Sequence, residues 1–95
     1  MILESISIIV DGLVQGVYFR QSTKAKATDL GITGEVKNKP DGTVHITATG
    51  AASKLNELVE WCWKGPDSAI VKNVKVEKIP LTIFADFNIV RQNKI

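Results

Sequence analysis

The sequence has little of several features that define other classes of protein. It holds one cysteine, Cys62, so neither an intrachain disulfide nor a closed thiolate metal site can form. No apolar run is long enough to span a bilayer, and the first residues lack the basic and apolar regions of a secretory signal. The formal net charge is only +2, and the lysines are scattered among acids. These absences predict a cytoplasmic protein with no membrane or nucleic-acid partner.

What is present fits one small globular domain. A chain of 95 residues, 44% of them hydrophobic, has room for a single core, so residues 1–95 are expected to form one domain. Apolar periodicity predicts two helices, over residues 19–30 and 53–64, the second capped by Ser53. It also predicts strands over residues 2–10, 32–37, 44–49, 71–78 and 84–91. In the fourth of these strands, Val74 and Val76 are expected to face inward.

The order of these elements is β-α-β-β-α-β followed by a short extra strand. This order predicts an α+β fold of the ferredoxin-like type, a two-layer sandwich in which both helices cover one face of an antiparallel sheet. Right-handed crossovers place the first and third strands in the middle of that sheet. Because one fold serves many functions, the function has to be argued from particular residues.

The stretch G-L-V-Q-G-V-Y-F-R, residues 12–20, separates the first strand from the first helix. A helix N-terminus offers unpaired N–H groups and a partial positive charge, so it favours anions. Gly12 and Gly16 are expected to shape a turn and to let a ligand approach the backbone closely. Arg20 lies in the first helical turn, where its charge opposes the helix dipole and where its planar fork suits phosphate oxygens. Two glycines and an arginine alone also fit an ordinary connector.

Other phosphate-binding templates are absent. Neither G-x-x-x-x-G-K-[ST] nor G-x-G-x-x-G occurs, which excludes a nucleoside-triphosphate P-loop and a dinucleotide fingerprint. A thiol phosphatase cradle needs a cysteine six positions before the arginine, where this chain has Val14. A phosphate held by this loop would therefore be attacked by another nucleophile, of which water is the simplest.

Residues 12–20 resemble the acylphosphatase signature, glycine-x-valine-glutamine-glycine-valine-x-phenylalanine-arginine, at every specified position. The resemblance continues through L-G-I-T-G at 30–34, V-K-N at 36–38, D-G-T-V at 41–44, W-C-W-K-G-P at 61–66 and F-x-I at 87–89. It covers essentially the whole chain and implies the ferredoxin-like fold. It also implies an enzyme that hydrolyses acyl phosphates to a carboxylate and inorganic phosphate with no metal or cofactor.

The resemblance implies the site residues as well. Arg20 would hold the phosphoryl oxygens, and Asn38 would orient the attacking water. The phosphate would be cradled by the backbone amides of Gln15, Gly16, Val17, Tyr18, Phe19 and Arg20. Inorganic phosphate or sulfate would bind the same loop, and a monomer is the default oligomeric state. The chemistry agrees, because an acyl phosphate already has a good leaving group and needs only a positioned water.

Several other residues invite a role and are expected to have none. Glu35 stands where many family members carry an aromatic residue, and we expect it to point into solvent. Lys37 and Lys39 flank Asn38 and are expected to be solvated. The single histidine, His45, alternates with inward-facing residues and is expected on the outer face of the sheet. Trp61 and Trp63 are expected to pack at the two edges of the second helix's buried stripe, and Cys62 within that stripe.

Two functions of other classes remain as alternatives. An RNA-recognition module has the same element order but stacks bases on aromatic residues of its central strands, and residues 43–49 contain none. A non-catalytic anion-binding or regulatory domain of the acylphosphatase-like type would share the loop. The presence of both Arg20 and Asn38 favours the enzyme.

Overall fold

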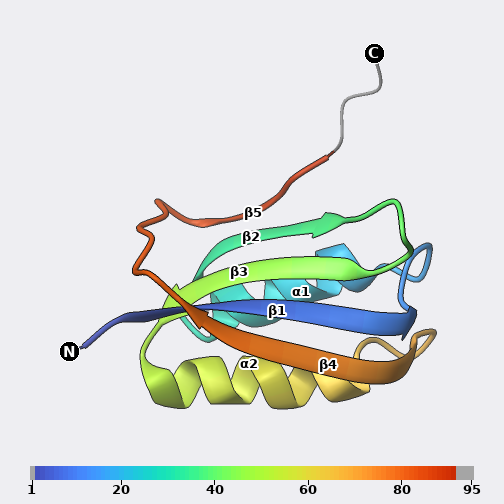
Figure 1. The fold of residues 1–95 in the computed structure, drawn as a ribbon, viewed down its shortest axis with the longest axis horizontal. Coiled ribbons are helices and arrows are strands. Elements are labelled where there is room, and N and C mark those ends of the chain that lie inside the picture. The colour runs from blue at the N-terminus through green and yellow to red at the C-terminus, as the bar shows by residue number, and fades with distance from the viewer. Residues whose placement is uncertain (1, 92–95) are drawn as a thin grey trace.

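A computed structural model of the chain describes residues 2–91. Its elements in chain order are β1 (Glu4–Leu13), α1 (Phe19–Asp29), β2 (Thr33–Asn38), β3 (Val44–Gly50), α2 (Ala52–Lys64), β4 (Ile70–Ile79) and β5 (Phe87–Ile89). The strands form one sheet in the order β4-β1-β3-β2-β5, with both helices on one face (Figure 1). The predicted ferredoxin-like sandwich, with β1 and β3 in the middle, is confirmed.

The added strand makes the sheet mixed. The four strands of the βαββαβ unit pair antiparallel throughout, as predicted, whereas β5 pairs parallel with β2. The register of this last pair sets Gly34 beside Phe87 and Val36 beside Ile89. The backbone N–H of Val90 continues the ladder by donating to the Val36 carbonyl at 2.8 Å. The chain after β5 therefore follows β2 toward the end of β2 that carries Asn38.

The core lies between the sheet and the two helices. Each central strand alternates buried and part-exposed residues, because successive side chains point to opposite faces. The fully buried side chains include Ile8, Val10, Val36, Val44 and Ile46 from the sheet and Phe19, Ala27, Leu58 and Cys62 from the helices. Within residues 2–91, no helix is long and apolar enough to cross a membrane.

Three details of the predicted elements are wrong. The fifth strand covers Phe87–Ile89 rather than residues 84–91. Helix α2 begins one residue before Ser53, with Ala51 as its extended N-cap and no capping side chain, because the N–H groups of Lys54 and Leu55 already donate to the Ala51 carbonyl. Val76 is 42% exposed although Val74 is buried, since β4 lies at the edge of the sheet where cover is incomplete.

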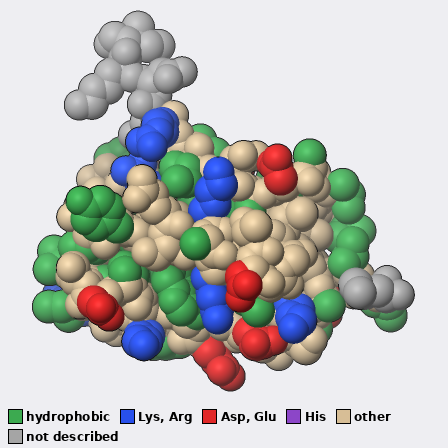
Figure 2. Space-filling view, turned by 180° about the vertical axis from the view of Figure 1, so that it is seen from behind, with side chains coloured by type: hydrophobic (Ala, Val, Ile, Leu, Met, Phe, Trp, Pro, Cys, Tyr) green, Lys and Arg blue, Asp and Glu red, His purple; other side chains and the backbone are tan. Residues whose placement is uncertain are grey.

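The two ends of the sheet carry different connections. At the right end in Figure 1, the β1–α1 loop and the β2–β3 turn lie together; at the left end, the chain passes from β4 to β5. Figure 2 shows the opposite side of the molecule, where basic and acidic side chains mix over the lower half and only basic ones gather at the upper left. The right-hand end in Figure 1 holds the candidate site.

Candidate active site

Strand β1 enters the site through a β-bulge. The pairing of β1 with β4 shifts register between Asp11 and Gly12, and Gly12 has a φ of 133°. A Cβ atom at Gly12 would overlap the backbone carbonyl oxygen of Ile70, so only glycine fits this close approach. The sequence prediction that Gly12 shapes the loop itself is wrong, because this residue lies inside β1, and the loop starts after Leu13.

The φ angle changes sign from residue to residue along the loop backbone. Gly16 has a φ of 74° and Tyr18 a φ of 63°, while Val17 between them has a negative φ. Such alternation is typical of an anion-binding nest, in which successive N–H groups point to one side. The N–H groups of residues 15–20 donate to no acceptor within residues 2–91. The loop thus presents unpaired donors at the N-terminus of α1.

Tyr18 carries the strain of this arrangement. It is the N-cap of α1 and the one non-glycine residue with positive φ in the described part of the chain. A left-handed conformation costs a non-glycine residue about 1–2 kcal/mol. The Tyr18 side chain is 75% exposed, so burial of the ring offsets little of that cost. Strain retained without a packing reason is typical of a functional backbone.

The Gln15 side chain ties the loop to the β2–β3 turn. Its Nε2 donates to the carbonyl oxygens of Lys39 and Thr43 at 2.8 and 3.0 Å, using both of its hydrogens. The same two residues close the turn, since the Lys39 N–H donates to the Thr43 carbonyl at 2.9 Å. Asp41 braces it further by accepting from the Thr43 hydroxyl and N–H. The side-chain amide of Gln15 therefore joins the two halves of the site, which are the β1–α1 loop and the β2–β3 turn.

Asn38 lies at the end of β2, directly before this turn. Its backbone is level with Val44 in the antiparallel ladder, which fixes where the side chain starts. The Oδ1 atom of Asn38 is buried and accepts no hydrogen bond from residues 2–91. Buried polar atoms are nearly always paired, so an unpaired one in a cavity wall is suited to a ligand or water.

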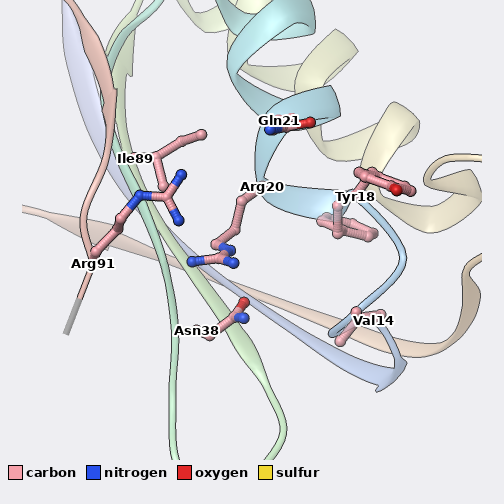
Figure 3. A pocket seen from close by; sticks show the side chains of 9 residues that line it. Val14, Tyr18, Arg20, Gln21, Asn38, Ile89 and Arg91 are labelled. Carbon is pink, nitrogen blue, oxygen red and sulfur yellow. The ribbon is translucent and has the colours of Figure 1, made fainter. Parts of the chain in front are cut away.

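A cavity of about 290 Å³ opens between these elements. The guanidinium groups of Arg20 and Arg91 and the amide of Asn38 point into it from α1, from the segment after β5 and from β2 (Figure 3). In the described part of the chain its lining consists of Val14, Gly16, Tyr18, Phe19, Arg20, Gln21, Asn38, Ile89 and Arg91, none of which is a carboxylate. The first turn of α1 also has no acidic residue. Two arginines and a helix N-terminus make this cavity strongly positive.

The predicted phosphate-binding residues divide into two kinds. Arg20 and Tyr18 line the cavity with their side chains. Phe19 is 1% exposed and packs its ring against Trp61, with the ring centroids 5.4 Å apart. Val17 packs against the core. For Val17 and Phe19 the side chain thus anchors the loop in the core and leaves the backbone N–H for the site.

The residues expected to have no role lie outside the cavity lining. Glu35, Lys37 and His45 are half-buried, and they alternate with the buried core residues of β2 and β3. Partial burial, followed by the charge of Lys39, lowers the pKa of His45. Burial raises the pKa of the Cys62 thiol to about 12, so this cysteine is not a nucleophile.

Two features of the site were missed in the sequence. The bridging role of the Gln15 side chain has no local signal, because it depends on how the loop meets the β2–β3 turn. Arg91 did have a signal. Residues 87, 89 and 91 share one face of an extended strand, and the first two are apolar and inward.

Comparison with known proteins identifies the family. A family model described as acylphosphatase matches residues 6–89. The chain is 49% identical to an acylphosphatase of Marinobacter nauticus over 81 residues, which are 84% of this chain and 88% of that protein. This chain belongs to the acylphosphatase family. The family and the enzyme class predicted from the sequence are confirmed.

Solved structures of acylphosphatases show the same fold. The Coxiella burnetii acylphosphatase superimposes with a TM-score of 0.90 at 41% identity, covering 93% of each chain. The Bacillus subtilis acylphosphatase gives a TM-score of 0.89 at 37% identity and covers 94% of this chain and 99% of its own. The family match ends at residue 89, so Arg91 lies beyond it.

Proposed function

We propose that this chain hydrolyses acyl phosphates to a carboxylate and inorganic phosphate in the cavity between α1 and the end of β2. One observation carries the proposal. Unpaired backbone N–H groups and the Arg20 guanidinium form one wall, and the buried, unpaired Oδ1 of Asn38 faces the same cavity. Donors for a phosphoryl group and an acceptor for water are the two parts that this reaction needs.

The phosphoryl group binds to the loop. The N–H groups of residues 15–20 and the Arg20 fork donate to its three non-bridging oxygens, where charge is spread in the loose transition state. The N–H groups are fixed by the strained backbone at Tyr18 and by the core packing of Phe19, so they do not reorganise as charge develops. Preorganised donors of this kind lower the barrier more than mobile water would.

Asn38 positions the nucleophile. A carboxamide does not titrate near neutral pH, so Asn38 acts through geometry: its Oδ1 accepts a hydrogen bond from water and aims the oxygen at phosphorus. The new P–O bond forms on the face opposite the acyl oxygen, the old P–O bond breaks, and the acyl group leaves as a carboxylate. The Gln15 bridge keeps this water site at a set distance from the phosphoryl cradle.

Hydrolysis of benzoyl phosphate by the purified protein tests the proposal. We expect the wild type to hydrolyse it, with inorganic phosphate as a competitive inhibitor. Arg20→Ala and Asn38→Ala should each lower kcat/KM by about 10²–10³-fold, as loss of one preorganised transition-state contact does. Lys24→Ala is the matched control, because it removes an exposed cation from the same helix outside this cavity.

Three results would contradict the proposal: no hydrolysis by the wild type, equal rates for wild type and both site variants, or a loss in Lys24→Ala as large as in Arg20→Ala. Phosphate binding without hydrolysis would instead favour the non-catalytic anion-binding domain. Repeating the assay with a metal chelator tests the prediction that no metal is needed, and the rate of hydrolysis should then be unchanged. Monomeric state and cytoplasmic location remain predictions, and sedimentation and cell fractionation would test them.

A further inference from the structure

Arg91 stands on the opposite side of the cavity from the phosphate loop. In the parallel β2–β5 pair, Val36 is level with Ile89, and continuing that register by two residues sets Arg91 level with Asn38. In Figure 3 the loop bearing Val14 and Tyr18 lies on one side of Arg20, and Arg91 and Ile89 lie on the other. Arg20 therefore separates the unpaired N–H groups from Arg91.

The described surroundings of Arg91 hold no acidic side chain that accounts for its charge. Among residues 2–91, no carboxylate lines the cavity. The ion pairs among residues 2–91 join Lys54 to Glu57, Lys75 to Glu77 and Lys78 to Glu4, and none includes Arg20 or Arg91. Two guanidinium groups directed into one cavity repel each other unless anionic groups bind between or beside them.

The cavity has room for more than a phosphoryl group. Its volume of about 290 Å³ corresponds to roughly ten water molecules at about 30 Å³ each. A phosphoryl group bound to the loop leaves the acyl part of the substrate to extend toward the segment after β5. That wall offers the half-buried apolar side chain of Ile89 and, two residues on, the exposed guanidinium of Arg91. Such a wall suits an apolar spacer that ends in a negative charge.

We propose that Arg91 binds a carboxylate on the acyl group, so that this chain prefers acyl phosphates that carry a second anionic group. The inference rests on the proposed function, because it takes the phosphoryl group to bind at the loop. The guanidinium fork meets a carboxylate with two parallel hydrogen bonds, which a lysine cannot match. Arg91 acts here as a specificity residue, and the hydrolytic chemistry stays with Arg20 and Asn38.

Three aromatic acyl phosphates test the preference: benzoyl phosphate, 4-carboxybenzoyl phosphate and 4-carbamoylbenzoyl phosphate. The last two match in size and differ in charge, and a para carboxylate cannot attack its own acyl phosphate. We expect kcat/KM of the wild type to be about fivefold higher for the carboxylate than for the carboxamide, a modest value because Arg91 is exposed. The difference should shrink as salt is added.

Variants at Arg91 assign the preference to this residue. Arg91→Gln should abolish the carboxylate-over-carboxamide ratio, and Arg91→Lys should keep part of it. Lys24→Gln, with a charge removed from outside the cavity, should keep all of it. An equal loss on all three substrates in Arg91→Gln would mean that Arg91 holds the phosphoryl group, and an unchanged ratio would mean that it contacts no acyl carboxylate. Either result overturns the proposal.

A binding measurement separates this proposal from the hydrolytic one. In 4-carboxyphenacylphosphonate and 4-carbamoylphenacylphosphonate a methylene replaces the bridging oxygen, so neither compound can be hydrolysed as an acyl phosphate. Titration calorimetry should give a Kd about fivefold lower for the carboxylate with the wild type and equal values with Arg91→Gln. That outcome would support the role of Arg91 even if benzoyl phosphate were not hydrolysed, and equal wild-type values would overturn it.

Discussion

At one end of the β1–β3 pair, buried polar groups satisfy one another, whereas at the other end they do not. Ser5 and Thr49 are level in the ladder, and their hydroxyl oxygens lie 2.6 Å apart. The Thr82 N–H donates to the Ser5 hydroxyl at 2.9 Å, and the Thr49 hydroxyl donates to the Thr82 carbonyl at 2.7 Å. This closed network fastens the β4–β5 connection to the sheet (Figure 1).

The opposite end of the same strands leaves its polar groups open. The loop N–H groups and the Oδ1 of Asn38 have no partner within residues 2–91, and Tyr18 holds a strained conformation. Satisfied buried networks contribute to stability, while open donors and strain cost stability and are retained where a ligand binds. The difference predicts that substitutions at the hydroxyl network change stability alone, and that substitutions at the loop change activity.

Apart from Arg20 and Asn38, the largest expected effect comes from Gln15, the one side chain within residues 2–91 whose hydrogen bonds join the loop to the β2–β3 turn. Gln15→Ala removes one hydrogen bond from each of two turn carbonyls, which keep their backbone partners, so the free energy of unfolding should fall by about 1–3 kcal/mol. The activity should fall by about tenfold or more, because Asn38 loses its fixed distance from the loop. Chemical denaturation and benzoyl phosphate kinetics measure the two effects.

An Asn38→Ala background separates positioning from stability. There, Gln15→Ala should still reduce the free energy of unfolding but should reduce the remaining activity far less, since the water-orienting amide is already gone. A full tenfold loss of activity in that background would show that Gln15 acts on the cradle rather than through Asn38.

The hydroxyl network should give the reverse result. Thr49→Val keeps the shape of a residue that is 3% exposed but leaves the Ser5 hydroxyl and the Thr82 carbonyl short of a partner. The free energy of unfolding should fall by about 1–3 kcal/mol, with kcat/KM unchanged. Thr47→Val, on the same face of β3 but outside this hydroxyl network, is the control and should change neither quantity. A loss of activity in Thr49→Val would break the separation of the two ends.

A smaller effect is expected at Tyr18, where strain and function coincide. Tyr18→Gly relieves a left-handed conformation that costs about 1–2 kcal/mol, although glycine's extra freedom in the unfolded chain offsets about 0.5–1 kcal/mol of the gain. Tyr18→Gly should therefore be up to about 1.5 kcal/mol more stable than Tyr18→Ala, which lacks the ring but keeps the strain. Phosphate should bind more weakly to Tyr18→Gly, because the nest is no longer rigid. Equal stability of the two variants would show that the loop stores no strain.

These contrasts also explain what the sequence could and could not predict. Period-two and helical patterns predicted the order of strands and helices, because burial imposes the same periodicity on any half-buried element. The loop was predicted as a phosphate site from the family signature and Asn38 from the wider resemblance to the family, and both roles stay predictions. The parallel pairing of β5 and the Gln15 bridge were not, since both depend on where segments far apart in the chain meet.

Errors at particular residues have the same cause. Gly12 looked like a loop glycine, but its role is set by the Ile70 carbonyl of a strand that begins 58 residues later. Val76 fits the inward alternation and is exposed only because β4 is an edge strand. The local sequence pattern shows which residues are able to be buried. Which of them are buried in the structure depends on the elements that pack against them.

The smallest expected effect is the pH response of His45, which lies near the open end but outside its cavity. Its pKa is lowered from 6.5 by partial burial and then by Lys39 and Lys37, against the opposing charge of Asp41. As pH falls through 6.5, the unfolded chain therefore takes up a proton before the folded one, and the free energy of unfolding decreases. In His45→Gln this decrease should be absent between about pH 7 and pH 5, a window above the range in which Asp41 titrates. Chemical denaturation at several pH values measures this decrease.

Because His45 does not reach the substrate, the pH profile of kcat should be the same in the wild type and in His45→Gln. A shifted profile would place His45 in the reaction after all.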